Sequence, residues 1–411
     1  MDLCRRECLD IMKARDIILF GAGEYAASFY RDFKEMLHIV GCVTNNQKET
    51  VFCVDGIEVC PIGRVEEVKK LERALVVVCA KENKLMQEQL KAMDMLYGRD
   101  YIDSDMLRIL FSEKKIAVFY GVCYTRAVYT CLQHSCEFKQ HYEAIYWLDY
   151  LPRDSFEEDA FFYLLKTCDL YITNAFLSDE KKRKNAIYIN RLHKTCKVLT
   201  IPILLFYGYY PCPLQKIGKD NLYNVISNAS PYAPFINPDH QINEMIMAGQ
   251  SLQQIKDRIS SLDYYCKEDI IKNYQKEMRK LEMAEMTADI KICDYLYEKH
   301  GKIRTFLNEK HISNAVILEM ARRILDKLQL KQDIDDGILK ERLLYTSEVP
   351  VYPAVIEALS LEVYKGTYTL YTFQGDVQLT FTEYVERYYE YCKSMFGYME
   401  KGYFPYVEAN R

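Results

Sequence analysis

Short apolar runs alternate with amphipathic segments over the first 112 residues of the chain. Continuous apolar runs are typical of strands in parallel sheets, because helices cover both faces of such sheets. Strand-like runs occupy residues 16–23, 38–46 and 74–81, and helix-like segments occupy residues 24–36 and 82–96. This alternation predicts a Rossmann-like parallel sheet with right-handed crossovers.

A second series of strands and helices follows the charged hinge at residues 112–115. Strand-like runs occupy residues 116–120, 142–151, 168–177 and 196–206, and a helix is expected at 155–167. The sequence therefore predicts a second α/β region over residues 113–235.

From residue 236 the pattern becomes mainly helical. Residues 241–260 predict two helices joined at Gly249. Residues 264–301 carry apolar positions at helical spacing and predict one helix that ends at Gly301. Another amphipathic helix is expected at 311–330, then a strand near 368–373 and a tyrosine-rich final helix. The overall prediction is an α/β protein with a 1–112 domain and a 113–411 domain whose C-terminal half is largely helical.

The composition is that of an ordinary globular protein, with 49% hydrophobic and 27% charged residues. A net charge of −5 gives no global field that would attract nucleic acid or anionic lipid. We expect neither a signal peptide nor a membrane span, since no apolar stretch reaches the roughly 20 residues a span needs. The 15 cysteines form no CxxC pairs, so we expect reduced thiols, a cytoplasmic location and no metal.

The turn Gly21-Ala22-Gly23 has the GxGxxA form in a strand–turn–helix context. Such a turn brings backbone amides close to a phosphate at a helix N-terminus. NAD is disfavoured because the second strand ends at 43–46 without the acidic residue that would hold the ribose. Two interpretations remain open: Gly21 and Gly23 hold a nucleotide-sugar, or the turn belongs to a structural unit that binds no ligand.

Residues 1–112 resemble the nucleotide-sugar-binding domains of bacterial sugar acetyltransferases. The matching segments are "ILFGAGEYA", "VGCVTNN", "GIEVCP" and "DYID". The resemblance implies a nucleotide-sugar as the ligand of this domain.

Cys123 follows a buried strand and a tight Gly121-Val122 turn, at the start of an expected helix. A thiol there would lie at the carboxyl edge of a sheet, and amides of the helix start would lower its pKa. The alternative is a small buried thiol that fills a turn. Among the seven histidines, His311 is the candidate general base, because Asn308 precedes it and a helix follows. A surface histidine in a capping loop is the competing interpretation.

The second domain resembles the WcbI-type polysaccharide-biosynthesis acetyltransferase family. The resemblance rests on Gly121-Val122-Cys123-Tyr124, on Ile201-Pro202 through Gly208-Tyr209-Tyr210-Pro211, and on Asn308-Glu309-Lys310-His311 followed by "RILDKLQL". Val122, Tyr124 and Ile312 depart from the family pattern. The resemblance implies binding of coenzyme A, transfer of an acetyl group in capsule or surface-polysaccharide synthesis, and Cys123 and His311 at the two positions that suggest catalysis.

The leading hypothesis is an acetyl-CoA-dependent O-acetyltransferase that takes a small acyl donor and a sugar or polysaccharide acceptor. His311 would be the base, and Glu309 or Asp149 would orient it. The amides of Cys123 and Tyr124, with Asn174, would hold an oxyanion. Gly121 and Tyr124 of the turn would contact coenzyme A, and Arg126 and Arg304 would bind its phosphates. A homo-oligomer is compatible with the sequence.

Two rival functions stay open. The order of turn, asparagine and histidine is similar to that of SGNH-type hydrolases, which would make the protein an esterase that removes acyl groups. The altered turn around Cys123 also allows a non-catalytic binding module of a polysaccharide-assembly complex.

Overall fold

The computed structural model describes residues 5–21, 23–45, 52–54, 57–59, 73–81, 83–150, 155–210, 235, 239–344, 346–372 and 375–400. The chain divides into two compact units. The first unit comprises Met1–Val122, Glu137–Thr173 and Ser178–Leu199, and the second comprises Cys123–Cys136, Asn174–Leu177 and Thr200–Arg411. The expected domain boundary at residue 113 stays a prediction.

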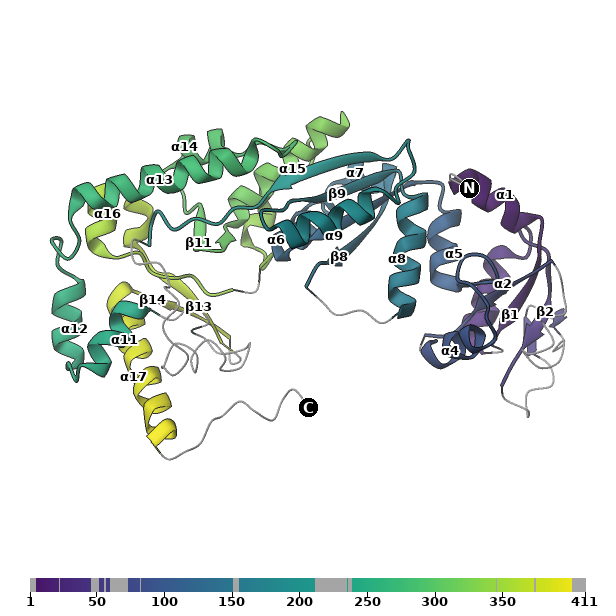
Figure 1. Cartoon of the computed structure of the whole chain (residues 1–411), viewed down its shortest axis with the longest axis horizontal. Coiled ribbons are helices and arrows are strands. Elements are labelled where there is room, and N and C mark those ends of the chain that lie inside the picture. The colour runs from purple at the N-terminus through teal and green to yellow at the C-terminus, as the bar shows by residue number, and fades with distance from the viewer. Residues whose placement is uncertain are drawn as a thin grey trace. The chain divides into compact units, whose positions relative to one another are not determined.

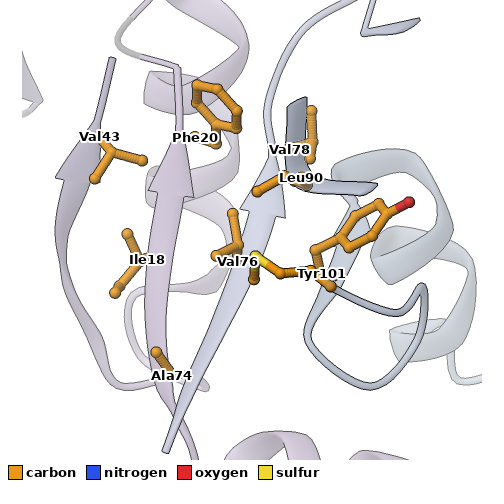
Figure 2. Close-up of a cluster of buried hydrophobic side chains, with 9 residues drawn as sticks. Ile18, Phe20, Val43, Ala74, Val76, Val78, Leu90 and Tyr101 are labelled. Carbon is orange, nitrogen blue, oxygen red and sulfur yellow. The ribbon is translucent and has the colours of Figure 1, made fainter. Parts of the chain in front are cut away.

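A four-stranded sheet forms the N-terminal part of the first unit, with the strand order β2-β1-β5-β6. The strands are β1 (Asp16–Phe20), β2 (Ile39–Val43), β5 (Ala74–Val78) and β6 (Tyr101–Asp103), and their pairings are parallel. Figure 2 shows side chains from these strands, among them Ile18, Phe20, Val76 and Tyr101, in one buried cluster. The apolar runs became strands because both faces of this sheet are covered.

Helices accompany these strands along the chain in the expected alternation. They are α1 (Arg5–Lys13), α2 (Glu24–Phe33), α4 (Lys84–Ala92) and α5 (Ser104–Phe111), and a hairpin of β3 (Phe52–Val54) and β4 (Ile57–Val59) lies between β2 and β5 in sequence. The Asp103 carboxylate accepts a hydrogen bond from the Met106 amide and so caps α5.

A second sheet has the strand order β10-β9-β7-β8. Its strands are β7 (Lys115–Gly121), β8 (Tyr142–Leu148), β9 (Leu170–Ala175) and β10 (Lys197–Pro202), and β7 pairs in parallel with β8 and β9. The helices α7 (Cys136–His141), α8 (Ser155–Thr167) and α9 (Asp179–Ile189) connect them. The expected strand at 196–206 ends early at Pro202, and buried residues such as Leu204 and Phe206 continue as loop.

The second unit is mainly helical, with short hairpins (Figure 1). Its helices are α6 (Cys123–Leu132), α11 (His240–Met247), α12 (Leu252–Ile259), α13 (Lys267–Glu285), α14 (Cys293–Lys299), α15 (Asn314–Leu328), α16 (Pro353–Leu359) and α17 (Phe381–Glu400), with 3₁₀ turns at Asp336–Lys340 and Glu362–Lys365. The hairpins pair β11 (Phe306–Asn308) with β12 (His311–Ile312), and β13 (Tyr368–Thr372) with β14 (Gly375–Leu379).

The single helix expected over 264–301 is wrong, because the structure breaks it into α13 and α14. Asp289 lies in the break, and its carboxylate accepts hydrogen bonds from the amide (2.8 Å) and hydroxyl (2.7 Å) of Thr200. The Glu285 carboxylate accepts from the amides of Ile292 and Cys293 and satisfies the start of α14. Tertiary hydrogen bonds therefore override a continuous helical pattern.

The α/β prediction is confirmed: parallel sheets with accompanying helices are followed by a largely helical C-terminal half. Across the residues that the structure describes, no helix combines the length and apolar character needed to cross a bilayer.

Candidate functional site

Cys123 lies where the topology of the second sheet changes direction. The connection after β7 leads to β8 on one side, whereas the connection after β9 leads to β10 on the other. The adjacent carboxyl ends of β7 and β9 therefore form the switch point at which α/β sheets bind ligands. Cys123, half-buried, is the first residue of α6 directly after β7, and Asn174 is near the end of β9.

The first turn of α6 is tied to Asn174 and to the chain after β10. The Thr125 hydroxyl donates to Oδ1 of Asn174 at 2.8 Å, and both residues are buried. The Tyr124 hydroxyl donates to the carbonyl of Pro202 (2.8 Å) and accepts from the Leu204 amide (3.3 Å). Asn174 therefore contacts a residue that lies two positions after Cys123 in the sequence. The Tyr124 hydroxyl is occupied by hydrogen bonds to the loop after β10.

His311 begins β12, in a hairpin directly before α15. Its Nδ1 lies 3.0 Å from Oδ1 of Asn308. Asn308 is fully buried, and its Nδ2 donates to the Thr346 hydroxyl (3.0 Å) and the Ser347 carbonyl (3.2 Å). The Lys310 amide also donates to Oδ1 of Asn308. These contacts fix the orientation of the Asn308 amide.

The orientation of Asn308 determines the tautomer of His311. Because Oδ1 of Asn308 can only accept, Nδ1 of His311 must carry the proton, and Nε2 keeps its lone pair. Burial, with a smaller contribution from the charge of Lys310, lowers the pKa of His311 from its usual 6.5 to about 4. His311 is therefore a neutral imidazole near pH 7, with an acceptor at Nε2, which is the form a general base requires.

Helix packing places Cys123 and His311 at the same end of the α6–α15 helix pair. Helices α6 and α15 pack against each other. Cys131 of α6 experiences the charge of Arg322 of α15, and the Ser135 hydroxyl, just after α6, donates to Asp333, which follows α15. Since Cys131 and Arg322 each lie eight positions after the first residue of their helix, the two helices run in the same direction from a common end.

A second connection joins the two sites through the loop after β10. Tyr124 holds Leu204, and two residues later the Phe206 amide donates to the Glu309 carbonyl at 2.9 Å. The Phe206 and Phe306 rings stack with centroids 4.6 Å apart. The segment from Pro202 to Phe206 thus links the first turn of α6 to the hairpin of His311.

The two arginines expected to bind coenzyme A differ in their surroundings. Arg304 forms an ion pair with Glu348 and lies over the rings of Tyr364 (5.1 Å) and Tyr368 (4.7 Å), so its charge is balanced within the fold. Arg126 lies half-buried on the first turns of α6, close in sequence to Cys123. Of the two, Arg126 is the better placed for a ligand at Cys123.

Neither carboxylate that was expected to orient His311 is its hydrogen-bond partner at Nδ1, which is Asn308. The Glu309 carboxylate lies 3.8 Å from Nζ of Lys310, and burial raises its pKa. The Asp149 carboxylate forms a 2.6 Å ion pair with Lys181 in the first unit. The amide of Asp149 donates to the Gly121 carbonyl and thereby fixes the end of β7.

The glycine turn of the N-terminal sheet also lies at a switch point, between β1 and β5. Gly21 has φ +122°, and a Cβ there would lie 2.8 Å from the Cys79 carbonyl oxygen, so the position requires glycine. A Cβ at Gly23 would meet no atom within 4 Å. Binding of a nucleotide-sugar at Gly21 and Gly23 stays a prediction.

No sequence pattern indicates Thr346 and Ser347, which hold Asn308 from positions almost 40 residues further along the chain. Gly208 packs against the Phe206 ring, and a Cβ at this position would lie 2.3 Å from that ring, so the close contact favours glycine in the Gly-Tyr-Tyr segment.

Within the described ranges, no group of three or more His, Cys, Asp or Glu side chains is arranged to hold a metal ion.

Comparisons with known proteins identify the family of the chain and a solved structure of similar fold. The family described as polysaccharide biosynthesis enzyme WcbI matches residues 117–333, which is more than half of the chain and includes Cys123, Asn174 and His311. A solved structure of WcbI matches with a TM-score of 0.54 and 15% identity, over 73% of this chain and 96% of that one. It is described as a novel polysaccharide biosynthesis enzyme, in its native form without a disulfide bond between coenzyme A and one of its cysteines. At this identity the match shows a shared fold. No curated protein matches the chain.

Proposed function

Because the chain belongs to the family of the polysaccharide biosynthesis enzyme WcbI, we propose that it is an acetyl-CoA-dependent O-acetyltransferase. Its acceptor would be a sugar or polysaccharide precursor of a capsule or other surface polysaccharide, bound as a nucleotide-sugar at the Gly21 turn or presented to the second unit alone. The observation that carries the proposal is a neutral His311 of fixed tautomer at the same end of the α6–α15 helix pair as Cys123.

His311 acts as the general base in this proposal. Its Nε2 takes a proton either from the acceptor hydroxyl or from the Cys123 thiol. Asn308 keeps the proton on Nδ1 and stabilises the imidazolium that forms, less strongly than a carboxylate would. A base whose pKa is held low is present almost entirely in its active, unprotonated form at neutral pH.

The start of α6 supplies the electrostatic part of the site. The first amides of a helix have no partner within the helix and carry a partial positive charge. At Cys123 and Tyr124 they would stabilise the oxygen anion of acyl transfer, and each such donor contributes roughly 3 kcal/mol. Asn174, which Thr125 holds next to this turn, would place a polar side chain beside the same oxygen anion.

The residues around His311 and Cys123 fit a polar, anionic ligand such as coenzyme A, which would supply the activated acetyl group. Ser313, two residues after His311, is buried, and its hydroxyl bonds to no group in the described part of the chain. A buried hydroxyl without a partner is costly unless a ligand or water satisfies it. Arg126 offers a cation near Cys123, and the description of the similar WcbI structure associates coenzyme A with a cysteine of that protein.

The test measures transfer of radiolabelled acetate from acetyl-CoA to a panel of nucleotide-sugars and polysaccharide fragments by the full chain. We expect His311→Gln to lower kcat/KM at least 100-fold, since a general base contributes about 10²–10⁴-fold. Cys123→Ser separates the roles of the thiol: a large loss supports transfer through Cys123, and a small one supports direct transfer to the acceptor.

Matched controls are His134→Gln and Cys136→Ser, because both side chains are exposed and His134 pairs with Glu341 on the surface. They should retain activity within twofold. Release of acetate from acetylated sugars without coenzyme A would favour the esterase instead. Absence of coenzyme A binding, with cellular function intact in both site variants, would leave the binding module as the better interpretation.

A further inference from the structure

A cavity of about 420 Å³ opens in the first unit, and none of its lining residues belongs to the sites described above. Its walls come from α1, from the turn before β6, from α8 and from the turn after α9. Ligand pockets for small molecules span roughly 300–1,000 Å³, so the cavity has a suitable size.

The cavity lies at the amino edge of the N-terminal sheet. Arg15 directly precedes β1, and Gly98 and Arg99 precede β6. The glycine turn at Gly21 follows β1, at the opposite, carboxyl edge of the same parallel strands. A ligand in the cavity would therefore be separate from one at the glycine turn.

The charge of the lining is entirely positive. Arg15, Arg99, Lys166 and Arg191 line the cavity together with His193, and no carboxylate is among the lining residues. Arg99 is balanced by its neighbour Asp100, whereas Lys166 and Arg191 form no ion pair with any residue in the described ranges. Two uncompensated cations at one opening favour an anionic ligand.

Two of the cations are held in place by the fold. The Arg15 guanidinium donates to the backbone carbonyls of Arg73, Ala74 and Arg99, so it cannot turn away from the cavity. The Arg191 guanidinium lies over the Phe162 ring at 3.9 Å from its centroid. Cations positioned before binding lose little conformational entropy when a phosphate arrives.

The remaining wall is apolar and aromatic. Tyr163 lies against Gly98, where a Cβ would be 2.3 Å from the ring, and its hydroxyl is hydrogen-bonded to the Cys8 thiol. Ile11 and Met12 of α1 complete this side. An apolar wall beside a cationic opening matches a ligand that has a flat or apolar body and a phosphate group.

We propose that this cavity binds a nucleotide, with the phosphates at Lys166 and Arg191 and the base or sugar against Tyr163 and Met12. Since α/β sheets bind their substrates at the carboxyl edge, a nucleotide at the amino edge would be a second, separate ligand of the protein. The proposal does not depend on the acetyltransferase activity.

Cys8 gives a readout specific to this cavity. The full chain is alkylated with N-ethylmaleimide in the presence of UDP or ADP, and modification of each cysteine is followed by mass spectrometry. We expect either nucleotide to slow alkylation of Cys8 at least fivefold, while the exposed Cys136 in the same sample reacts at an unchanged rate. Lys166→Glu and Arg191→Gln should raise the nucleotide concentration required at least tenfold, and the exposed α9 substitutions Lys182→Glu and Arg183→Gln should leave it within twofold.

Uridine and pyrophosphate test the two halves of the ligand. Both should protect Cys8 less than UDP does. Equal protection by uridine would overturn phosphate recognition, and equal protection by pyrophosphate would overturn recognition of the nucleoside. The proposal also fails if neither nucleotide protects Cys8, or if protection survives in Lys166→Glu. Should Cys8 resist alkylation in the free chain, equilibrium dialysis decides: Lys166→Glu must bind one UDP or ADP fewer per chain than the unaltered protein.

Discussion

At the scale of single residues, the contact between Asn308 and His311 determines the properties of the proposed base. An asparagine fixes the tautomer of a histidine as an aspartate would, but it adds no negative charge to favour the imidazolium. With no carboxylate at Nδ1, burial dominates and the pKa of His311 falls to about 4.

Asn308→Asp should therefore raise the pKa of His311. A carboxylate at hydrogen-bond distance raises the pKa of a neighbouring base by roughly 1–3 units, because it favours the charged imidazolium. The pKa is measured from the ring resonances of His311 by NMR, and the acid limb of kcat/KM should move to higher pH in parallel. On acidification, the variant would lose activity at a higher pH than the unaltered protein does, because protonated His311 cannot accept a proton.

Asn190→Asp is the matched control, since the same chemical change is made at an exposed position of the first unit. It should leave the His311 resonances unchanged. An unaltered pKa in Asn308→Asp would contradict the assignment of Asn308 as the group that orients His311.

At the scale of elements, the break between α13 and α14 shows where local pattern and tertiary structure disagree. The apolar spacing over residues 264–301 is helical, and nothing near Asp289 in the sequence signals an interruption. The hydrogen-bond partner of Asp289 is Thr200, which is 89 positions away and lies in β10. A contact this distant cannot be read from periodicity, whereas buried strands such as β1 and β5 can, because each has its own continuous apolar run.

Asp289→Ala tests this interpretation. Hydrogen bonds to a charged group contribute about 1.5–3 kcal/mol, and the exposure of this pair favours the lower part of that range. We expect a loss of about 1–2 kcal/mol in the free energy of unfolding of the second unit, measured with urea.

A continuous helix would respond in the opposite way. Alanine at an exposed position inside a helix is neutral or slightly stabilising, since it has the highest helix propensity. Glu298→Ala is the control, because Glu298 is exposed and pairs only with its neighbour Lys299 in the contacts described. It should change the stability by less than about 0.5 kcal/mol, as expected for a surface position.

At the scale of the whole molecule, the two parallel sheets repeat one strand order. Numbered in sequence within each sheet, both have the order 2-1-3-4, and both place a turn of interest after their first strand, at Gly21 and at Cys123. The sequence predicts these positions because each turn follows an apolar strand and precedes a helix. The apolar pattern alone cannot place Asn174 against the first turn of α6, because that depends on the strand order. Nor can it place Cys123 and His311 at the same end of two packed helices, because that depends on the packing of α6 with α15.

The low pKa of His311 should also make the free energy of unfolding of the second unit depend on pH. In the unfolded chain His311 titrates near 6.5, whereas in the folded protein its pKa is about 4. Below pH 6.5 the unfolded state therefore binds a proton that the folded state excludes. The contribution of His311 to stability is complete above pH 6.5 and is lost as the pH falls toward 4, up to about 3 kcal/mol. Burial also lowers the pKa of His300, so the effect of this histidine has the same sign.

Urea unfolding of the second unit, followed in the full chain between pH 7.5 and 4.5, measures this dependence. The free energy of unfolding should fall more steeply with acidification in the unaltered protein than in His311→Gln, and least steeply in the double variant with His300→Gln. His134→Gln should follow the unaltered protein, because that side chain is exposed in both states. Parallel curves for His311→Gln and the unaltered protein would mean that His311 is protonated equally well when folded, and the proposal of a neutral base would lose its physical support.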